Sequence, residues 1–493
     1  MFESAEIGHK VGKHEFREGE EKLRTALLDA QYRLLESKAF SVVVLVDGVE
    51  GAGKGDTVNL LNKWLDPRHV EVRAFDRPSS DEAERPYMWR FWRVLPPAGK
   101  WCVVFGDWYG SVLAGRVAKK VDEAAFLRRL DDINRFEAML SRENVLLVKL
   151  WFHLSKVAQK RRFDTLSADD KTRWRVTDED WAAHQRYDRT REIAARMLHA
   201  TDSGEAPWTV VDSENANYRS LFAGRTLLDA VTRRIELARP SIQLPAQRQE
   251  LPPLSDRRTF LDTLELDQKC SRKEYDDQLE QLQGRLARLT RDKAFGKRSL
   301  VLVFEGMDAA GKGGAIRRVT AALDARHYRV YPIAAPTDEE AARPYLWRFW
   351  RHAPRLGKTV IFDRSWYGRV LVERVEGFAA EADWMRAYGE INDFERSLAD
   401  AGAVIVKFWL AISSDEQLRR FREREAEAHK RFKITPDDWR NRHNWAAYEE
   451  AVADMIERTG GEHPWTVVEA DNKHFARIKV LRTICERLEQ ALA

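Results

Sequence analysis

The chain has few cysteines and no long apolar run. Only three of its 493 residues are cysteines, and Cys102, Cys270 and Cys485 lie far apart with no metal-binding spacing. Such a sparse set excludes a disulfide framework and is typical of a reducing compartment. No stretch approaches the ~20 apolar residues of a membrane-spanning helix, and residues 1–13 have no apolar core of signal-peptide length. We therefore expect a cytoplasmic protein that has no membrane partner.

The chain also lacks a strong net charge. It carries 83 basic residues (Lys and Arg) against 79 acidic ones, which leaves a net charge of +4. Overall charge therefore identifies no partner, and any argument for a polyanion has to rest on local clusters of cations. Hydrophobic residues, in contrast, make up 44% of the chain, which is ample for sizeable cores. The length is that of roughly two to four domains.

A glycine-rich loop occurs twice, and it is the most informative feature of the chain. Residues 48–55 read GVEGAGKG and residues 306–313 read GMDAAGKG, so that the two loops are 258 positions apart. The same offset aligns RPYMWRFWR at 85–93 with RPYLWRFWR at 343–351. A period this long, far above the ~20–50 residues of solenoid repeats, indicates the tandem duplication of a whole domain.

The segment between the two copies has the character of a linker. It contains four prolines and no apolar periodicity, and such a composition predicts an irregular connection. We therefore expect a first domain at residues 1–237, a linker at 238–257 and a second domain at 258–493.

Each copy shows the pattern of alternating strands and helices. Residues 41–46 and 299–304 are short continuous apolar runs, which are typical of strands buried on both faces of a parallel sheet. The spacing of apolar residues predicts helices over about residues 15–36 and 258–292. Further strands are predicted in the second copy at residues 328–333, 359–362, 403–410 and 465–468. We expect an α/β fold in which a mostly parallel sheet is flanked by helices, built twice.

A strand, a glycine-rich turn and a helix in this order predict a phosphate-binding loop. The loop exposes backbone N–H groups at a helix N-terminus, where partial positive charge favours phosphate. Lys312 would add a point charge on the transferring phosphate. A glycine turn beside a surface lysine is the alternative without function. The predicted phosphate-binding positions of the loop are Gly306, Ala309, Ala310, Gly311 and Gly313.

The loop departs from the usual pattern at the residue that follows the lysine. A serine or threonine that holds Mg²⁺ is expected there, but the position is Gly313 in the second copy and Gly55 in the first. Carboxylates must then hold the cation. Asp308 in the loop and Asp363 at the end of a predicted strand are the candidates. Asp363 could instead cap a helix, since aspartate is a favoured N-cap residue.

Only the second copy has a complete set of charged residues. Residues 363–369 read DRSWYGR, whereas the aligned residues 105–111 read FGDWYGS. Asp107 could in principle substitute for Asp363, although it would project from a different place. We therefore expect the second copy to be active and the first to be degenerate. Phe105, Gly106 and Ser111 stand where the second copy has the predicted catalytic residues Asp363, Arg364 and Arg369.

Two clusters of cations follow the strand predicted at 403–410. In a small-molecule phosphotransferase the helices after this strand form a lid, whose cations close over the phosphates. A solvated, charged helix would give the same pattern. The first copy has Thr172 in place of Lys430, so its lid is weaker. The predicted phosphate-binding residues of the lid in the second copy are Arg420, Arg424, Lys430 and Lys433.

Together these motifs resemble polyphosphate kinase family 2, and in particular its fused two-domain members. The family commonly has asparagine where this chain has Gly368 and tryptophan where it has Phe432, and neither change removes a charge. The resemblance rests on the loop at 306–313, Pro336-Thr337, YLWRFW at 345–350, DRSWYGR at 363–369 and KRFK at 430–433.

The resemblance implies a tandem pair of P-loop kinase domains with a thymidylate-kinase-like fold and a helical lid, and a reaction that needs Mg²⁺ as cofactor. Fused members of this kind transfer phosphate from inorganic polyphosphate to AMP and make ADP, with the chemistry in the C-terminal copy. The first copy would then be a structural half that forms an internal pseudo-dimer with its sibling. Because single-domain relatives typically self-associate, a homo-oligomer is a further expectation.

Three other functions stay open at this point. Polyphosphate could phosphorylate ADP or GDP, because no residue identifies the acceptor. A nucleoside monophosphate kinase that uses ATP is a second alternative, although the missing serine or threonine after Lys312 weighs against it. The third is a non-catalytic polyanion-binding protein, whose binding would fall steeply with salt and would not need Asp363. Nucleic acid is not an expected partner, because one copy carries a complete catalytic set.

Overall fold

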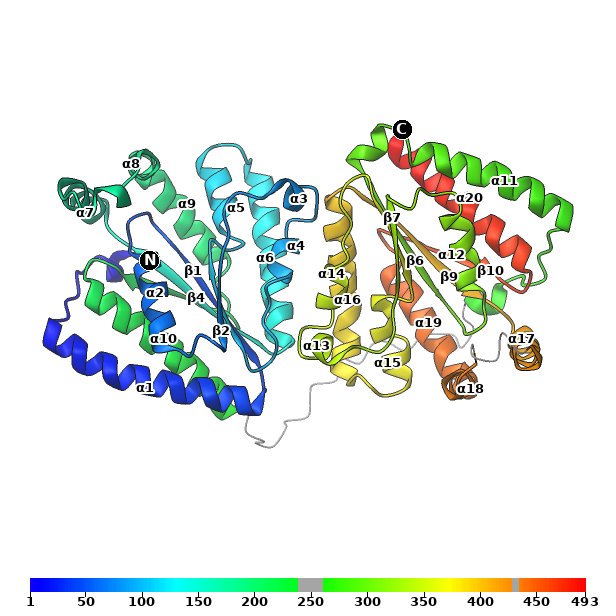
Figure 1. Cartoon of the computed structure of the whole chain (residues 1–493), viewed down its shortest axis with the longest axis horizontal. Coiled ribbons are helices and arrows are strands. Elements are labelled where there is room, and N and C mark those ends of the chain that lie inside the picture. The colour runs from blue at the N-terminus through cyan, green and yellow to red at the C-terminus, as the bar shows by residue number, and fades with distance from the viewer. Residues whose placement is uncertain (238–259, 428–433) are drawn as a thin grey trace. The chain divides into compact units, whose positions relative to one another are not determined.

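The computed structural model describes residues 1–237, 260–427 and 434–493. These residues separate into two compact units, each centred on one five-stranded sheet in which neighbouring strands are parallel (Figure 1). The predicted α/β fold, built twice, is therefore confirmed. The linker predicted at 238–257 lies outside the described residues.

The first copy of the repeat begins with a 3-10 helix, an α-helix and a strand that leads into the loop, and it ends with α10. Its elements are η1 (Glu3–Ala5), α1 (Lys13–Ser37), β1 (Ser41–Gly48), α2 (Lys54–Trp64), β2 (Val70–Ala74), α3 (Ser80–Ala83), α4 (Trp89–Trp92), β3 (Trp101–Phe105), α5 (Gly110–Val117), α6 (Glu123–Arg142), β4 (Val145–His153), α7 (Lys156–Ala168), η2 (Arg173–Arg175), α8 (Asp178–Gln185), α9 (Tyr187–Ala200), β5 (Trp208–Asp212) and α10 (Ala216–Leu237).

The second copy repeats this succession with small local changes. Its elements are η3 (Phe260–Thr263), α11 (Arg272–Leu289), η4 (Ala294–Lys297), β6 (Ser299–Gly306), α12 (Lys312–Thr320), β7 (Tyr328–Pro332), α13 (Asp338–Ala341), α14 (Trp347–Trp350), β8 (Thr359–Asp363), η5 (Trp366–Arg369), α15 (Val372–Val375), α16 (Glu381–Asp400), β9 (Ala403–Ala411), α17 (Ser414–Ala426), α18 (Pro436–His443), α19 (Trp445–Thr459), β10 (Trp465–Glu469) and α20 (Lys473–Leu492).

Both sheets have the same strand order, which places the glycine-rich loop at the centre. The order is β2-β3-β1-β4-β5 in the first unit and β7-β8-β6-β9-β10 in the second. The central strand, β1 or β6, leads into the loop, and the strands that follow it lie on both of its sides. Open α/β sheets bind ligands at the carboxyl ends of their strands at such a switch point.

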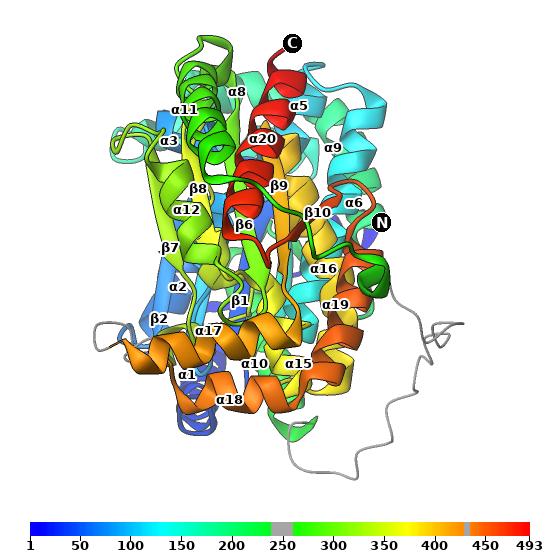
Figure 2. The ribbon, with the colours of Figure 1, turned by 90° about the vertical axis from the view of Figure 1, so that its right-hand side faces the viewer.

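Helices cover both faces of the second sheet. α11, α12 and α20 lie on one face, and α16 and α19 lie on the other (Figure 1). α17 and α18 lie side by side across one end of this sheet (Figure 2). Since β9 leads directly into α17, this is the end at which the carboxyl termini of the strands and the loop are found.

The six predicted strands are all present, with bounds that differ by two residues at most, and the helix predicted at 15–36 is α1. The helix predicted at 258–292 is wrong at its start, because α11 begins at Arg272. Ser271 caps it. The Ser271 hydroxyl accepts from the Glu274 N–H at 3.3 Å and the Glu274 carboxylate accepts from the Ser271 N–H at 2.9 Å. This capping box fixes the first turn of the helix.

A buried ion pair joins β9 to α16 in the second unit. The Nζ of Lys407 on β9 donates to Glu395 Oε2 on α16 at 2.7 Å, to the Tyr367 hydroxyl at 2.9 Å and to the Thr459 carbonyl at 2.7 Å. Glu395 Oε1 in turn accepts from the Tyr367 hydroxyl at 2.6 Å and from the Trp366 indole at 3.1 Å. Both charges are buried and fully paired, so they anchor the segment that follows β8.

The first unit repeats each of these contacts. Lys149 Nζ lies 2.7 Å from Glu137 Oε2, and Glu137 Oε1 accepts from the side chains of Tyr109 and Trp108. Lys149 also donates to the Thr201 carbonyl and the Tyr109 hydroxyl. The anchor is therefore a property of the fold and not of the predicted active copy alone.

The three cysteines are unpaired, as expected. Burial raises the pKa of the Cys102 thiol to about 12 and that of Cys485 to about 11, so both behave as small apolar groups at neutral pH. Within the described ranges, no helix has the length and apolar character needed to cross a bilayer.

We expect Lys407→Met to lower the free energy of unfolding of the second unit by about 3–5 kcal/mol, because it leaves the buried Glu395 carboxylate without its cation. Lys149→Met should do the same to the first unit. Thermal unfolding followed by circular dichroism would show one displaced transition in each variant. Arg326→Met, which removes an exposed ion pair with Asp324, is the control and should change little. A Lys407→Met protein that unfolds like wild type would contradict the role of the pair.

Candidate active site

The loop of the second unit joins β6 to α12 and has a backbone that needs glycine. Gly306 has a φ of +147°, and a Cβ atom there would lie 2.5 Å from the Leu410 carbonyl oxygen. Gly311 has a φ of +110° and is the N-cap of α12. Between them, Ala309 is also left-handed, with a φ of +63°. The loop thus leads into the N-terminus of a nine-residue helix, where backbone N–H groups and the helix dipole favour an anion.

Lys312 begins α12 and folds back over the loop. Its Nζ donates to the carbonyl oxygens of Gly306 at 2.6 Å and Met307 at 3.3 Å. Burial lowers the pKa of the Lys312 ammonium group, and the charge of Arg364 lowers it further, against the opposing effect of nearby carboxylates. The ammonium group is therefore held by neutral acceptors, and a charged phosphate oxygen would be a stronger partner.

Asp308 lies in the loop and is held from two sides. Its Oδ1 accepts from Arg364 Nη2 at 2.9 Å, and its Oδ2 accepts from Asn441 Nδ2 at 2.8 Å. Arg364 follows the last residue of β8 and has a φ of +64°, a conformation that few non-glycine residues adopt. Residues of the loop, the end of β8 and helix α18 therefore meet at this carboxylate. Asn441 is not among the residues that the sequence predicts.

Asp363 is the last residue of β8 and lies beside the loop. β8 pairs with β6, and Asp363 stands opposite Phe304, two residues before Gly306. Among the residues that the structure describes, none forms a hydrogen bond or an ion pair with its carboxylate. Its oxygens are therefore available to a cation.

Asp308 and Asp363 fit what Mg²⁺ requires in a phosphotransferase. Mg²⁺ is typically bound through one or two carboxylates, with waters and substrate phosphates as the remaining ligands. In the described parts of the chain, no group of three or more His, Cys, Asp or Glu side chains could hold a metal alone. The donor set therefore suits a cation that arrives with phosphate, rather than a metal in a closed protein site.

Glu305 is a carboxylate of this site that the sequence prediction missed. It ends the buried part of β6, directly before the loop, and its Oε1 accepts from the Ser365 hydroxyl at 2.7 Å. Burial raises the pKa of the Glu305 carboxyl group, whereas the Ser365 hydrogen bond and the charges of Lys312 and Arg364 lower it. The available signal was an acidic residue at the end of an otherwise apolar strand, repeated as Asp47 in the first copy.

Arg369 lies on the same segment as Asp363 and Arg364, at the end of η5. Its Nε is 2.8 Å from Glu373 Oε2, and its side chain is mostly buried. The first copy has Ser111 and Gly115 at the corresponding positions. The arginine and its carboxylate partner are therefore both missing there.

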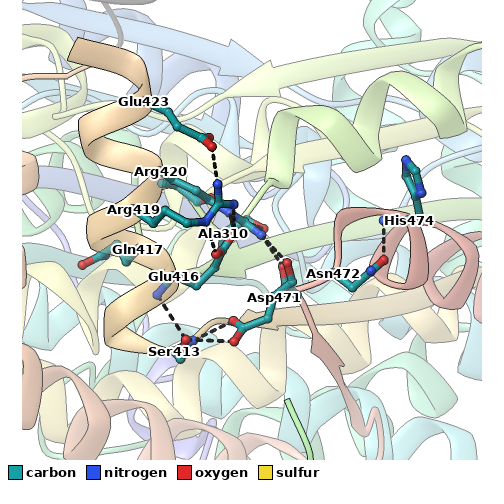
Figure 3. Close-up of polar contacts among 12 residues, drawn as sticks. Ala310, Ser413, Glu416, Gln417, Arg419, Arg420, Glu423, Asp471, Asn472 and His474 are labelled. Atoms are coloured by element: carbon teal, nitrogen blue, oxygen red, sulfur yellow. Dashed lines mark hydrogen bonds and ion pairs between the residues drawn. The ribbon is translucent and has the colours of Figure 1, made fainter. Parts of the chain in front are cut away.

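Arg420 on α17 holds the back of the loop (Figure 3). Its side chain is 2% exposed. Nη1 donates to the carbonyls of Ala309 and Ala310 at 2.9 and 3.1 Å, and Nη2 donates to those of Ala470 and Asp471 at 2.7 and 2.9 Å. Arg420 thus joins α17, the loop and the segment after β10. Its predicted contact with phosphate stays a prediction.

The other predicted lid residues are only partly described. Arg424 is half-buried on α17, and burial lowers the pKa of its guanidinium group, while Asp438 and Asp308 oppose that effect. Lys430 and Lys433 lie outside the described residues. The structure therefore brings Lys312, Asp308, Asp363 and Arg364 together around the loop, with Arg420 behind it.

The first unit keeps the loop, but its backbone leaves no space for a side chain at the position of Arg364. Gly106 stands where the second unit has Arg364, with a φ of +73°, and a Cβ atom there would lie 2.4 Å from the Phe75 carbonyl oxygen. Asp107 is buried, and its Oδ1 accepts from the Tyr109 N–H at 2.9 Å. It aligns with Ser365 and so does not lie where Asp363 does.

A carboxylate of the first unit binds the arginines beside its loop. Asp56, in the first turn of α2, stands where the second copy has Gly314. It accepts from Arg175 at 2.5 Å and from Arg162 at 3.4 Å, and Arg219 is 3.9 Å away. Burial lowers the pKa of Arg219 to about 10, as does the charge of Arg162, and Asp56 opposes both. One carboxylate of the protein therefore offsets part of the positive charge of these three arginines.

Comparisons with protein families, curated proteins and solved structures all match this chain to the same family. The sequence profile of the family described as "Polyphosphate kinase 2 (PPK2)" matches residues 10–237 and again residues 269–493. A Pseudomonas aeruginosa protein named polyphosphate:AMP phosphotransferase is 51% identical over 492 residues, covering 100% of this chain and 99% of its own length. A protein of the same name from Acinetobacter johnsonii is 39% identical, covering 95% of this chain and 96% of its own length.

A solved structure shares the fold over the full chain. It is the crystal structure of a putative polyphosphate kinase 2 from Pseudomonas aeruginosa. The two chains superpose with a TM-score of 0.89 and are 50% identical, and the match covers 100% of this chain and 99% of the other.

We expect Gly106→Arg to destabilise the first unit without creating activity there. The left-handed backbone alone costs a non-glycine residue about 1–3 kcal/mol, and the Cβ clash with the Phe75 carbonyl adds to this. Ser111→Arg, at an exposed position, is the matched control and should be tolerated. Both can be compared by the midpoint of thermal unfolding. If Gly106→Arg unfolds at the wild-type temperature, the position has more room than the structure indicates.

Proposed function

This chain belongs to the polyphosphate kinase 2 family, as its motifs predicted, and we propose that it transfers a phosphoryl group from inorganic polyphosphate to AMP, giving ADP. The observation that carries the proposal is the cluster of Lys312, Asp363 and Arg364 around the loop of the second unit. The first unit has Phe105 and Gly106 at two of these positions. We therefore place the chemistry in the C-terminal copy.

Phosphoryl transfer depends on positioning and charge neutralisation more than on covalent help from the protein. In this proposal the loop N–H groups and Lys312 hold the transferring phosphoryl group, and Lys312 exchanges the Gly306 carbonyl for a charged oxygen. Arg364 and Arg369 neutralise the polyphosphate chain or the AMP phosphate. Each of them starts from an ion pair, to Asp308 or Glu373 respectively, with which a phosphate would compete.

The remaining cations have distinct roles in the proposal. Arg424, Lys430 and Lys433 add positive charge from the lid. Arg420 supports the loop, because four backbone carbonyls accept from its terminal nitrogens. We expect Arg420 to act on phosphate binding mainly through the shape of the loop.

Mg²⁺ is the proposed cofactor, held by Asp308 and Asp363 together with substrate phosphates. When bound, the cation would neutralise charge on the transferring group. Each oxygen of Asp308 already accepts one N–H, and a carboxylate oxygen has a second lone pair to offer. Asp363 can offer both of its oxygens.

The first unit is structural in this proposal. We keep the division into domains at 1–237 and 258–493 with a linker at 238–257, and we propose that the two domains form an internal pseudo-dimer. Association of whole chains into a homo-oligomer is a further part of the proposal. The three unpaired cysteines favour a cytoplasmic site of action.

The direct test measures ADP formed from AMP, polyphosphate and Mg²⁺ in the absence of ATP. We expect wild type to be active and Lys312→Ala to lose about 10²–10³-fold in kcat, the usual effect of removing one preorganised donor from a transition state. Lys54→Ala is the matched control in the first unit and should retain wild-type turnover. Equal losses in both variants would show that the first unit takes part in the chemistry. If wild type phosphorylates ADP but not AMP, the assignment of AMP as the acceptor is wrong.

Asp363→Asn should lower kcat by about 10²-fold or more while leaving the fold intact, because it removes a charge but preserves the shape of the side chain. The half-saturating Mg²⁺ concentration should rise as well. Asp107→Asn in the first unit should leave both quantities unchanged. Near-normal turnover by Asp363→Asn would remove Asp363 from the mechanism.

A further inference from the structure

Asn441 connects helix α18 to the carboxylate of the phosphate loop. Its Nδ2 donates to Asp308 Oδ2 at 2.8 Å, and its Oδ1 accepts from the Tyr448 hydroxyl at 3.2 Å. Tyr448 is buried on α19. The amide is therefore held at both ends, one by the loop and one by a buried hydroxyl, which fixes the direction in which its N–H groups point.

Helix α18 is itself fixed at Glu376, whose side chain is 7% exposed. Arg440 Nε lies 2.6 Å from Glu376 Oε2, and Asn444 Nδ2 donates to Glu376 Oε1 at 3.1 Å. On its other side α18 is joined to α17, because Arg442 Nη1 donates to the Gln417 side chain at 3.1 Å. The position of Asn441 is thus set by contacts of its own helix and not only by its bond to the loop.

Gln417 adds a second contact between these helices and the same loop residue. Its Nε2 donates to the backbone carbonyl of Asp308 at 3.1 Å. Gln159 makes the equivalent contact to Glu50 in the first unit, at 2.8 Å. The backbone of the loop is therefore held in both units, whereas the bond from Asn441 to the carboxylate belongs to the second unit.

The first unit keeps the link between these two helices, because His184 Nδ1 lies 2.7 Å from Gln159 Oε1, but it has none of the side chains that fix the Asp308 carboxylate and Glu376. The corresponding residues are small or differ in kind, and Ala183 replaces Asn441 itself. The contacts of Asn441 and Glu376 are therefore missing from the same unit that lacks the charges at 363, 364 and 369. The other replacements are Ala118 for Glu376, Ala182 for Arg440, Arg186 for Asn444 and Thr190 for Tyr448.

An amide donor suits the carboxylate of Asp308 for an electrostatic reason. Arg364 already neutralises part of its charge through Oδ1. A second cation at Oδ2 would cancel the negative charge that a metal ion needs, whereas the neutral Asn441 holds the oxygen in place and leaves the charge available. Without Asn441, the carboxylate would be free to turn about its bond toward Arg364 alone.

We propose that Asn441 is a positioning residue of the phosphotransfer site, which orients the Asp308 carboxylate for its role beside the phosphates. The proposal rests on the proposed function of the second unit. It differs from that function in naming a residue outside the loop and outside the strand end, and in assigning its effect to Asp308.

The test is a double-mutant cycle of Asn441→Ala and Asp308→Ala. Asn441→Ala should lower kcat/KM for ADP formation by about tenfold to a hundredfold, the range for a lost hydrogen bond to a charged group. In the Asp308→Ala background the same substitution should change kcat/KM by less than about twofold, because the group through which it acts is gone. The unfolding midpoint should stay close to the wild-type value, because α18 keeps its contacts with Glu376 and Gln417.

A binding measurement separates positioning from catalysis. Polyphosphate with Mg²⁺ should raise the unfolding midpoint of wild type, and it should raise that of Asn441→Ala by less. Ala183→Asn, in the first unit, is the matched control and should behave as wild type in both assays. The proposal would be overturned if Asn441→Ala lowered kcat/KM equally with and without Asp308. It would also be overturned if Asn441→Ala lowered the unfolding midpoint of the ligand-free protein and this instability accounted for the loss of kcat/KM.

The two proposals fail in different ways. If wild type forms no ADP from AMP and polyphosphate, the proposed function is wrong. If wild type is active and Asn441→Ala matches it in kcat/KM and in stabilisation by ligand, only the assignment of Asn441 is overturned.

Discussion

The buried lysine–glutamate pair is the constraint on which the rest of each unit depends. Removing two charges from water costs several kcal/mol per ion unless each finds partners, and here the partners come from distant parts of the chain. Lys407 and Glu395 require β9, α16 and the end of α19 to meet at one point, and they require the side chains of Trp366 and Tyr367 to complete the set. The segment that begins with Asp363 is thereby held beside the loop.

This constraint also explains how one copy can lose a site and keep its fold. The buried lysine–glutamate network is complete in both units. The first unit therefore keeps its sheet, its loop and the segment after β3, even where the exposed residues of that segment differ. With the scaffold secured, Phe105 and Gly106 could replace the aspartate and the arginine, and Asp56 could take the arginines beside the loop as its own partners. These changes reinforce one another, because arginines whose charge is partly offset by Asp56 attract a phosphate less strongly.

Local patterns made the strands, the loop and the asymmetry between the copies predictable from the sequence. Buried parallel strands are continuous apolar runs, the loop has fixed glycines, and the duplication allowed position-by-position comparison. What escaped prediction depends on contacts between distant positions. Asn441 meets Asp308 across more than a hundred residues, and Glu305 is a site residue only because Ser365 and Lys312 fold against it. The start of α11 departs from the apolar spacing because the capping box at Ser271 fixes the first turn of the helix there.

The cations of the second unit differ in how many protein contacts each must break to bind a phosphate. This difference indicates which of them bind phosphate and which support the loop. Arg420 donates to four backbone carbonyls and is 2% exposed, so releasing it would leave several buried acceptors unpaired. Among the described residues, Lys312 donates to two neutral carbonyls, and a phosphate oxygen is a better acceptor than either. Arg364 is more exposed and is paired with the Asp308 carboxylate, whose other oxygen Asn441 retains when the arginine turns away. Phosphate is therefore expected to engage Lys312 and Arg364 first, on a loop that Arg420 keeps in shape and beside a carboxylate that Asn441 keeps in place.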